Sequence, residues 1–290
     1  MSLRRRMAGA AVASLLASAP VLAARDWAQA TGFAEAAPVN LRYGSERTQT
    51  AGFWPGAGAS AAPLVLLVTD GGWRTRMDFD RRGLAETLAM SGMAVAVARH
   101  RPDRPTEVRA MMADICTLLQ HMAATAARRK LRTDRIAIIG FSAGAAPAAL
   151  LATNLSDDAC PILQGSALKA LILVDPLGLD PEATLQAARP DVRPQIEAAL
   201  GRNPADRRRN ALATYLAPPN VPAAFVLGNK NDRRDLDAAA AAAGQMKANG
   251  IDAQFLPIPL DHIGDSSTNF GSRDNPTTQA LVRYLWQRLR

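Results

Sequence analysis

The chain has 290 residues, 48% of them hydrophobic, and carries a formal net charge of +8 at pH 7. This length allows one large domain, and α/β folds of this size commonly stay single. The positive excess is modest and spread along the sequence, which argues against a nucleic-acid-binding protein. We expect the basic run at residues 207–209 to lie on a solvated helix face.

The first residues have the layout of a bacterial secretory signal. Three arginines at positions 4–6 precede an uncharged stretch at 7–19, and residues 21–23 form a small-residue cleavage site. The apolar stretch is too short to span a bilayer comfortably, so we expect no stable membrane anchor. The arginines also hint at the twin-arginine export route. Removal of residues 1–23 leaves a net charge of +5, and the mature protein is expected to be periplasmic or secreted.

From residue 24 onward, apolar segments alternate with segments of helical spacing. Strands are predicted within residues 39–44, 48–55, 63–73, 93–101, 135–140, 167–176, 223–229 and 253–259. Helices are predicted within 79–92, 106–130, 143–154, 235–250 and 275–290. The pattern predicts an α/β fold whose mainly parallel sheet is covered by helices on both faces. Residues 177–219 interrupt the alternation and are predicted to form an inserted lid within a single domain at 24–290.

The motif Gly140-Phe141-Ser142-Ala143-Gly144 lies between a predicted strand and an alanine-rich helix. This is the layout of the nucleophile elbow of α/β hydrolases, in which a serine occupies a sharp, strained turn. Side chains at the two glycine positions would crowd that turn. The amino terminus of the following helix favours negative charge beside the serine. We therefore predict that Ser142 is a nucleophile.

A serine nucleophile needs a base, and the sequence holds three histidines. His121 lies inside a predicted long helix, which favours a surface or packing role. His100 ends a predicted strand and is a candidate to line the cleft. His262 follows the last strand and is the histidine that keeps the chain order serine, acid, histidine, so we predict it as the base.

The oxyanion of an acyl-transfer reaction needs fixed donors. The N–H of Ala143, directly after the nucleophile, is one expected donor, and Gly71 or Gly72 in the loop after an earlier strand supplies the other. We expect Asp70 to order this turn through an Asx-type hydrogen bond. Trp73 and Phe141 are expected to contact the substrate.

Two aspartates compete for the acid that orients the base. Asp232 follows the predicted strand at 223–229, and Asp175 follows the strand before it. We favour Asp232, because Asp235 is placed to cap the next helix and would leave Asp232 directed at the imidazole. Asp175 precedes Pro176 and has an alternative role in shaping the turn into the insertion. The choice between the two stays open.

Together, these residues resemble the α/β-hydrolase carboxylesterases of the hormone-sensitive-lipase-like and feruloyl-esterase-like group. The resemblance rests on residues 41–55, 63–73, 140–144, 226–236 and 261–285, and it covers nearly all of the chain after residue 24. It implies a triad of Ser142, Asp232 and His262. It also implies oxyanion glycines at 71 and 72, although the family's loop histidine is absent here. The sequence Asp-Gly-Gly-Trp at 70–73 is closer to the loop of VirJ-type periplasmic hydrolases.

The function that follows is an exported serine hydrolase that cleaves small-molecule or lipid carboxylic esters through an acyl-enzyme, with no metal or organic cofactor. A VirJ-like lipid-ester hydrolase and a non-catalytic binding protein on the same fold are the alternatives. The residues of the insertion do not fix an acyl chain or an alcohol.

The chain has two cysteines, Cys116 and Cys160. They lie on the helix before the elbow strand and just past the helix after it. Right-handed crossovers place these two helices side by side. We therefore predict a disulfide with the two Cα atoms within about 7 Å.

Overall fold

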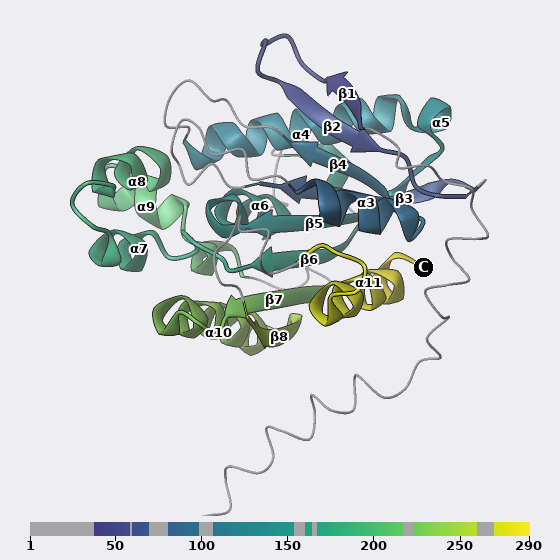
Figure 1. Ribbon diagram of the computed structural model, residues 1–290. Helices are drawn as coiled ribbons and strands as arrows, with labels where there is room; N and C mark the ends of the chain where they lie inside the picture. Colours follow the sequence, from purple (N-terminus) through teal and green to yellow (C-terminus); the bar gives the residue numbers. More distant parts are fainter. Residues whose placement is uncertain are drawn as a thin grey trace, which may run out of the picture. The chain divides into compact units, whose positions relative to one another are not determined.

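The computed structural model describes residues 38–58, 60–69, 81–98, 107–153, 160–163, 167–216, 223–259 and 270–290, which belong to one compact unit. Its centre is an eight-stranded sheet in the order β1-β2-β4-β3-β5-β6-β7-β8 (Figure 1). The strands are β1 (Val39–Arg42), β2 (Thr50–Trp54), β3 (Ala62–Val68), β4 (Ala94–Ala98), β5 (Leu131–Phe141), β6 (Leu168–Val174), β7 (Ala223–Asn229) and β8 (Asp252–Ile258). The pairs β1–β2 and β2–β4 are antiparallel, and all other pairs are parallel. The predicted α/β fold is confirmed.

Helices flank both faces of this sheet. They are α3 (Arg82–Met90), α4 (Val108–Ala124), α5 (Ala126–Arg129), α6 (Ala145–Thr153), α7 (Pro181–Ala187), α8 (Arg193–Leu200), α9 (Pro204–Arg209), α10 (Arg233–Ala248) and α11 (Pro276–Leu289). Short 3-10 turns are η1 (Ser142–Gly144), η2 (Pro161–Leu163) and η3 (Leu212–Tyr215). In the described part of the chain, no helix is long and apolar enough to cross a membrane.

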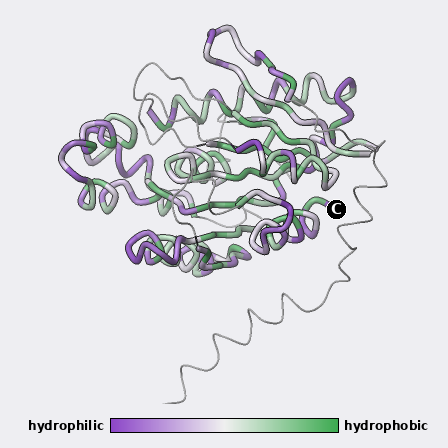
Figure 2. Tube along the Cα trace, in the orientation of Figure 1, coloured by the Kyte–Doolittle hydropathy of each residue, from purple (hydrophilic) through white to green (hydrophobic). Residues whose placement is uncertain are grey.

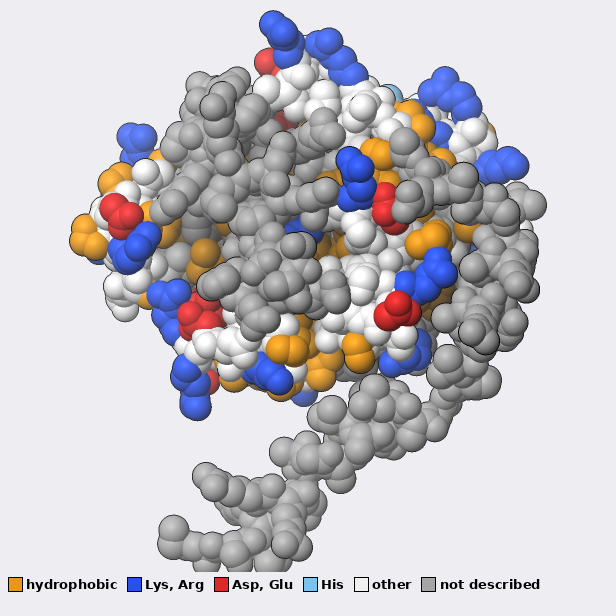
Figure 3. All heavy atoms as spheres, viewed as in Figure 1, with side chains coloured by type: hydrophobic (Ala, Val, Ile, Leu, Met, Phe, Trp, Pro, Cys, Tyr) orange, Lys and Arg blue, Asp and Glu red, His pale blue; other side chains and the backbone are white. Residues whose placement is uncertain are grey.

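The central strands are apolar because both of their faces are covered. Every residue of β3 and of β7 is buried. One core cluster joins the sheet to α4, α6 and α10, and a second joins the opposite face to α3 and α11. Figure 2 shows the hydrophobic strands inside and polar positions along the outer helices. On the face seen in Figure 3, the visible Lys and Arg side chains are scattered and do not form one patch.

The segment between β6 and β7 folds as a helical insertion made of α7, α8, α9 and η3. Its apolar residues Leu185, Leu200 and Leu212 join the core cluster on the α4 and α6 face. Arg109 on α4 holds the insertion from outside, since its guanidinium donates to Asn210 Oδ1 at 3.0 Å and to the Tyr215 hydroxyl at 2.7 Å. The residues predicted to interrupt the strand and helix alternation are therefore helical themselves.

One helix and one strand differ clearly from the predicted elements. The helix expected over 106–130 divides into α4 and α5 at Thr125, whose hydroxyl donates to the His121 carbonyl at 2.8 Å. Such a side-chain bond to the backbone competes with regular helix geometry. The elbow strand begins at Leu131 rather than at 135, because its first residues pair with β3.

The edge strand β8 pairs with β7 over its full length. Pro257 lies in this strand, opposite Gly228. At the other edge, β1 has four residues and carries Val39, which is 47% exposed. The Gly140–Gly144 motif lies away from both edges, at the carboxyl end of the inner strand β5.

Candidate active site

Ser142 lies at the turn between β5 and α6, as the motif predicts. Its backbone has φ of 47°, in the left-handed region that a residue with a side chain seldom adopts. Gly140 has no room for a side chain, because a Cβ there would lie 2.7 Å from the Cα of Ala145. The crowding inferred from sequence is thus present, and the strained serine is the mark of a nucleophile elbow.

Gly144 brings the elbow against the end of β3. A Cβ at this position would lie 2.5 Å from the Val68 carbonyl oxygen and 2.9 Å from that of Thr69. Thr69 immediately precedes the predicted oxyanion loop, so the chain enters this loop beside the elbow. Asp70, Gly71, Gly72 and Trp73, the predicted residues of this loop, lie outside the described residues.

Ala143 is fully buried in the middle of the 3-10 turn η1, and α6 begins two residues later. The amino terminus of α6 therefore adjoins Ser142, as the sequence indicates, and its dipole favours negative charge there. Pro147 falls in the first turn of α6, where the missing N–H costs no bond within this helix. The role of the Ala143 N–H as an oxyanion donor stays a prediction.

Phe141 has a different place from the one expected. Its side chain is 1% exposed and belongs to the core cluster on the α3 and α11 face. The ring of Phe270 meets it edge-on at 6.3 Å, and the Arg81 guanidinium lies 4.3 Å from its ring centre. Phe141 is therefore a core side chain in this structure rather than an exposed substrate contact. The alternation of Ala137, Ile139 and Phe141 on one face of β5 was the sequence signal for this.

Asp175 lies beside Ser142 at the same end of the sheet. Phe141 pairs with Val174 in the register of β5 and β6, so Ser142 and Asp175 are the next residues of two neighbouring strands. Asp175 is 7% exposed and has φ of 47°, the same value as Ser142. The sequence leaves Asp175 as the rival of Asp232 for the acid, with a turn-shaping role as its alternative, and the burial of its side chain was not foreseen.

Asp232 is the N-cap of α10. Its Oδ1 accepts hydrogen bonds from the N–H groups of Arg234 at 2.9 Å and Asp235 at 3.1 Å. The expectation that Asp235 caps this helix is wrong, because Asp235 already lies in the first helical turn. Asp232 is partly exposed. Its predicted role as the triad acid stays a prediction.

Of the three histidines, His121 alone belongs to the described residues, where it lies in the last turn of α4. Burial lowers the pKa of His121 below its ordinary value, and the charges of Arg129 and Arg128 lower it further. The predicted base His262 and the candidate cleft residue His100 lie outside the described residues. In the described part of the chain, no cluster of His, Cys, Asp and Glu is suited to a metal ion.

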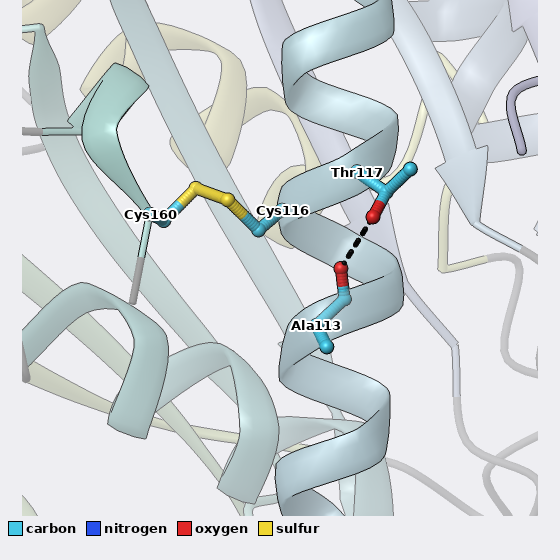
Figure 4. Close-up of a disulfide and its surroundings, with 4 residues drawn as sticks. All are labelled: Ala113, Cys116, Thr117 and Cys160. Carbon is cyan, nitrogen blue, oxygen red and sulfur yellow. Dashed lines mark hydrogen bonds between the residues drawn. A yellow bond between two sulfur atoms is a disulfide. The ribbon is translucent and has the colours of Figure 1, made fainter. Parts of the chain in front are cut away.

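The predicted disulfide is present behind the elbow. Cys116 of α4 and Cys160, just before η2, are bonded, with their Cα atoms 5.4 Å apart. Figure 4 shows Cys160 reaching the flank of α4, next to the turn in which Thr117 donates to the Ala113 carbonyl. This bond ties the segment after α6 to the helix before β5.

Comparison with known proteins agrees with this geometry. The family model BD-FAE matches residues 53–233, more than half of the chain. The chain belongs to the BD-FAE family. No curated protein matches it. The matched residues include β3, the turn at Ser142 and β7, and they end one residue after Asp232. The match therefore covers most of the sheet of this BD-FAE member.

Solved structures share the fold of this BD-FAE member. Esterase B from Lactobacillus rhamnosis is 21% identical, with a TM-score of 0.70 over 96% of this chain and 95% of that one. Butyrate-bound Est2 from Thermogutta terrifontis is 18% identical, with a TM-score of 0.65 over 87% and 93%. Carboxyl esterase 2 from Tuber melanosporum is 14% identical, with a TM-score of 0.69 over 87% of each chain. The fold of the chain is therefore the one that these esterases share.

Proposed function

We propose that this BD-FAE protein is a serine hydrolase that cleaves carboxylic esters through an acyl-enzyme. The observation that carries the proposal is the left-handed backbone of Ser142, at a turn where Gly140 and Gly144 have no room for a side chain. A serine held at this cost between a buried strand and a helix presents its hydroxyl at the carboxyl end of the sheet.

The reaction proceeds in two steps. Ser142 Oγ attacks the ester carbonyl carbon while His262 accepts its proton, and the N–H groups of Ala143 and of Gly71 or Gly72 stabilise the oxyanion. The protonated histidine then gives the proton to the departing alcohol. Water, activated by the same histidine, releases the acid and restores Ser142. A carboxylate at the carboxyl end of the sheet orients the imidazole.

The substitution Ser142→Ala tests the proposal directly. We expect it to lower kcat for a p-nitrophenyl ester by several orders of magnitude and to abolish labelling by a fluorophosphonate. Ser91→Ala is the matched control, because Ser91 ends α3 and donates to the Thr87 carbonyl, outside the elbow. Undiminished turnover in Ser142→Ala contradicts the proposal, and unlabelled wild-type protein favours a binding protein instead.

Short acyl chains are the substrate class that we propose first. The support is by analogy, since one Esterase B structure contains a tributyrin phosphonate inhibitor and the Est2 structure contains butyrate. Rates on p-nitrophenyl acetate, butyrate, octanoate and a phospholipid ester measure the preference. A preference for octanoate or for the phospholipid contradicts this assignment and favours a VirJ-like role.

We also propose that the protein is exported and loses residues 1–23. The arginines and the uncharged stretch of that segment support this, as does a disulfide, which persists in oxidising compartments. The intact mass of protein recovered from the periplasm or the medium measures the processing. A protein found only in the cytoplasm with residues 1–23 attached contradicts the proposal.

A further inference from the structure

The carboxyl end of the sheet offers two aspartates at different distances from the nucleophile. In the register of the sheet, Phe141, Val174 and Leu227 form one row across β5, β6 and β7. Asp175 is one residue beyond this row and one strand from Ser142, a spacing of about 4.8 Å between neighbouring strands. Asp232 is five residues beyond the row and two strands away. Asp175 is therefore at the level of the nucleophile.

Two backbone hydrogen bonds fix Asp175 from both sides. Its N–H donates to the Leu227 carbonyl of β7 at 2.7 Å, which extends the sheet by one residue. Two residues later, the N–H of Leu177 donates to the carbonyl of Ser142 itself at 3.0 Å. The chain that carries the carboxylate is thus bonded directly to the nucleophile's own residue. A group placed on rigid elements in this way holds its geometry well.

The choice of aspartate at position 175 carries two costs. A buried carboxylate loses its hydration, and a left-handed backbone is strained for a residue with a side chain. Glycine or asparagine would satisfy the same turn with less of either cost. A strained backbone and a buried carboxyl group at one residue beside a nucleophile indicate that the carboxylate of that residue has a function at the site.

Asp232, in contrast, has a structural task that accounts for its presence. Its Oδ1 accepts two N–H groups of the first turn of α10, and an aspartate is among the preferred residues for that position. The spacing of Asp232 and Asp235 also matches an acidic capping pattern, with an acid three residues after the N-cap. The Asp232 carboxyl group therefore needs no catalytic role to explain its conformation.

We propose that Asp175, rather than Asp232, is the positioning carboxylate of this hydrolase. It accepts a hydrogen bond from the imidazole N–H of the base and stabilises the imidazolium that forms when Ser142 is deprotonated. Asp175 stays ionised throughout, so no proton passes to it. This assignment rests on the proposed function, in which Ser142 is the nucleophile.

Two isosteric substitutions separate the two aspartates. Asp175→Asn keeps the shape of the residue, and asparagine tolerates a left-handed backbone, so the fold is retained. We expect it to lower kcat by about 10³–10⁴-fold with little change in KM. Asp232→Asn keeps an N-cap oxygen and should leave both kcat and the melting temperature near the wild-type values. Asp180→Asn is the matched control, since Asp180 caps α7 through the N–H of Ala183.

The pH profile gives a readout that a purely structural role would not move. A nearby carboxylate raises the pKa of an imidazole, so its removal lowers that pKa. We expect the acid limb of kcat/KM to shift to lower pH in Asp175→Asn and to stay in place in Asp232→Asn and Asp180→Asn.

An inactive Asp232→Asn together with an active Asp175→Asn overturns the assignment. If Asp175→Asn does not fold, Asp232→Asn still decides: full activity supports Asp175, and a loss of about 10³-fold or more overturns it. Ser142→Ala, measured in parallel, keeps the two proposals apart. An active Ser142→Ala refutes the serine mechanism, whereas an inactive one with an active Asp175→Asn refutes only the role of Asp175.

Discussion

Gly144 makes the closest approach between the elbow and the neighbouring strand, so it is the sharpest place to test how the site is built. In Gly144→Ala, the new Cβ would lie 2.5 Å from the Val68 carbonyl oxygen, whereas ordinary contacts begin at 3.4 Å. The overlap is therefore about 0.9 Å, and it is with backbone rather than with a flexible side chain. Because β3 is buried along its whole length, it has little freedom to withdraw.

The expected cost of Gly144→Ala is about 3 kcal/mol, at the upper end of overpacking in a well-packed core. For a protein of this size, that corresponds to a fall in melting temperature of about 6–12 °C. Part of the displacement falls on Ser142, and a shift of about 1 Å in a reacting group lowers turnover by about 10²-fold. Differential scanning calorimetry and ester turnover on the same preparations measure the two effects.

Gly244→Ala is the matched control for this substitution. Gly244 lies inside α10 and has nothing within 4 Å of an added Cβ. Alanine is favoured over glycine in a helix by about 1 kcal/mol, so this variant should melt at a higher temperature and keep full activity. If Gly144→Ala matches the wild type in both melting temperature and turnover, the close packing of the elbow on β3 is not what shapes the site.

The remaining predictions concern stability. The disulfide Cys116–Cys160 joins residues 44 positions apart, and its reduction should lower the free energy of unfolding by about 4 kcal/mol in the chain-entropy description. Urea unfolding with and without a reductant measures this difference, and coincident unfolding curves contradict the prediction. Burial raises the pKa of Tyr284 from 10.0 to about 12, so the unfolded state loses this proton first and stability falls between those pH values. Between pH 9 and pH 11.5, the free energy of unfolding should fall by about 2 kcal/mol less in Tyr284→Phe than in the wild type, as measured by urea unfolding. An equal pH dependence of stability in both proteins refutes the raised pKa of Tyr284.

The strands of the sheet could be predicted from the sequence because most of them are continuous apolar runs. The strand at 223–229 has the observed bounds of β7, since an uninterrupted apolar run flanked by polar residues permits few other arrangements. The elbow could also be predicted, because a sharp turn at Ser142 requires glycine at positions 140 and 144, and this requirement is local to the five residues of the motif. The disulfide followed from the handedness of the crossovers, which does not depend on side-chain detail.

The capping of α10 could not be predicted, because Asp232 and Asp235 are both suitable N-cap residues. The outcome depends on where the chain leaves β7. The Asn229 side chain accepts the N–H of Asn231 at 3.0 Å, and this short turn delivers Asp232, not Asp235, to the start of the helix. The burial of Asp175 was hidden for a similar reason, since it arises from elements distant in sequence that pack around the end of β6.

The proline in β8 affects how readily two copies of the molecule associate through their sheet edges. An edge strand presents unpaired N–H and C=O groups that invite another strand, and this is a common route to aggregation. Pro257 has no N–H to offer and restricts the backbone of the strand at that point. At the opposite edge, β1 is only four residues long and ends at Arg42. Both edges of the described sheet are thus poor templates, which favours solubility at the concentrations that a crowded compartment imposes.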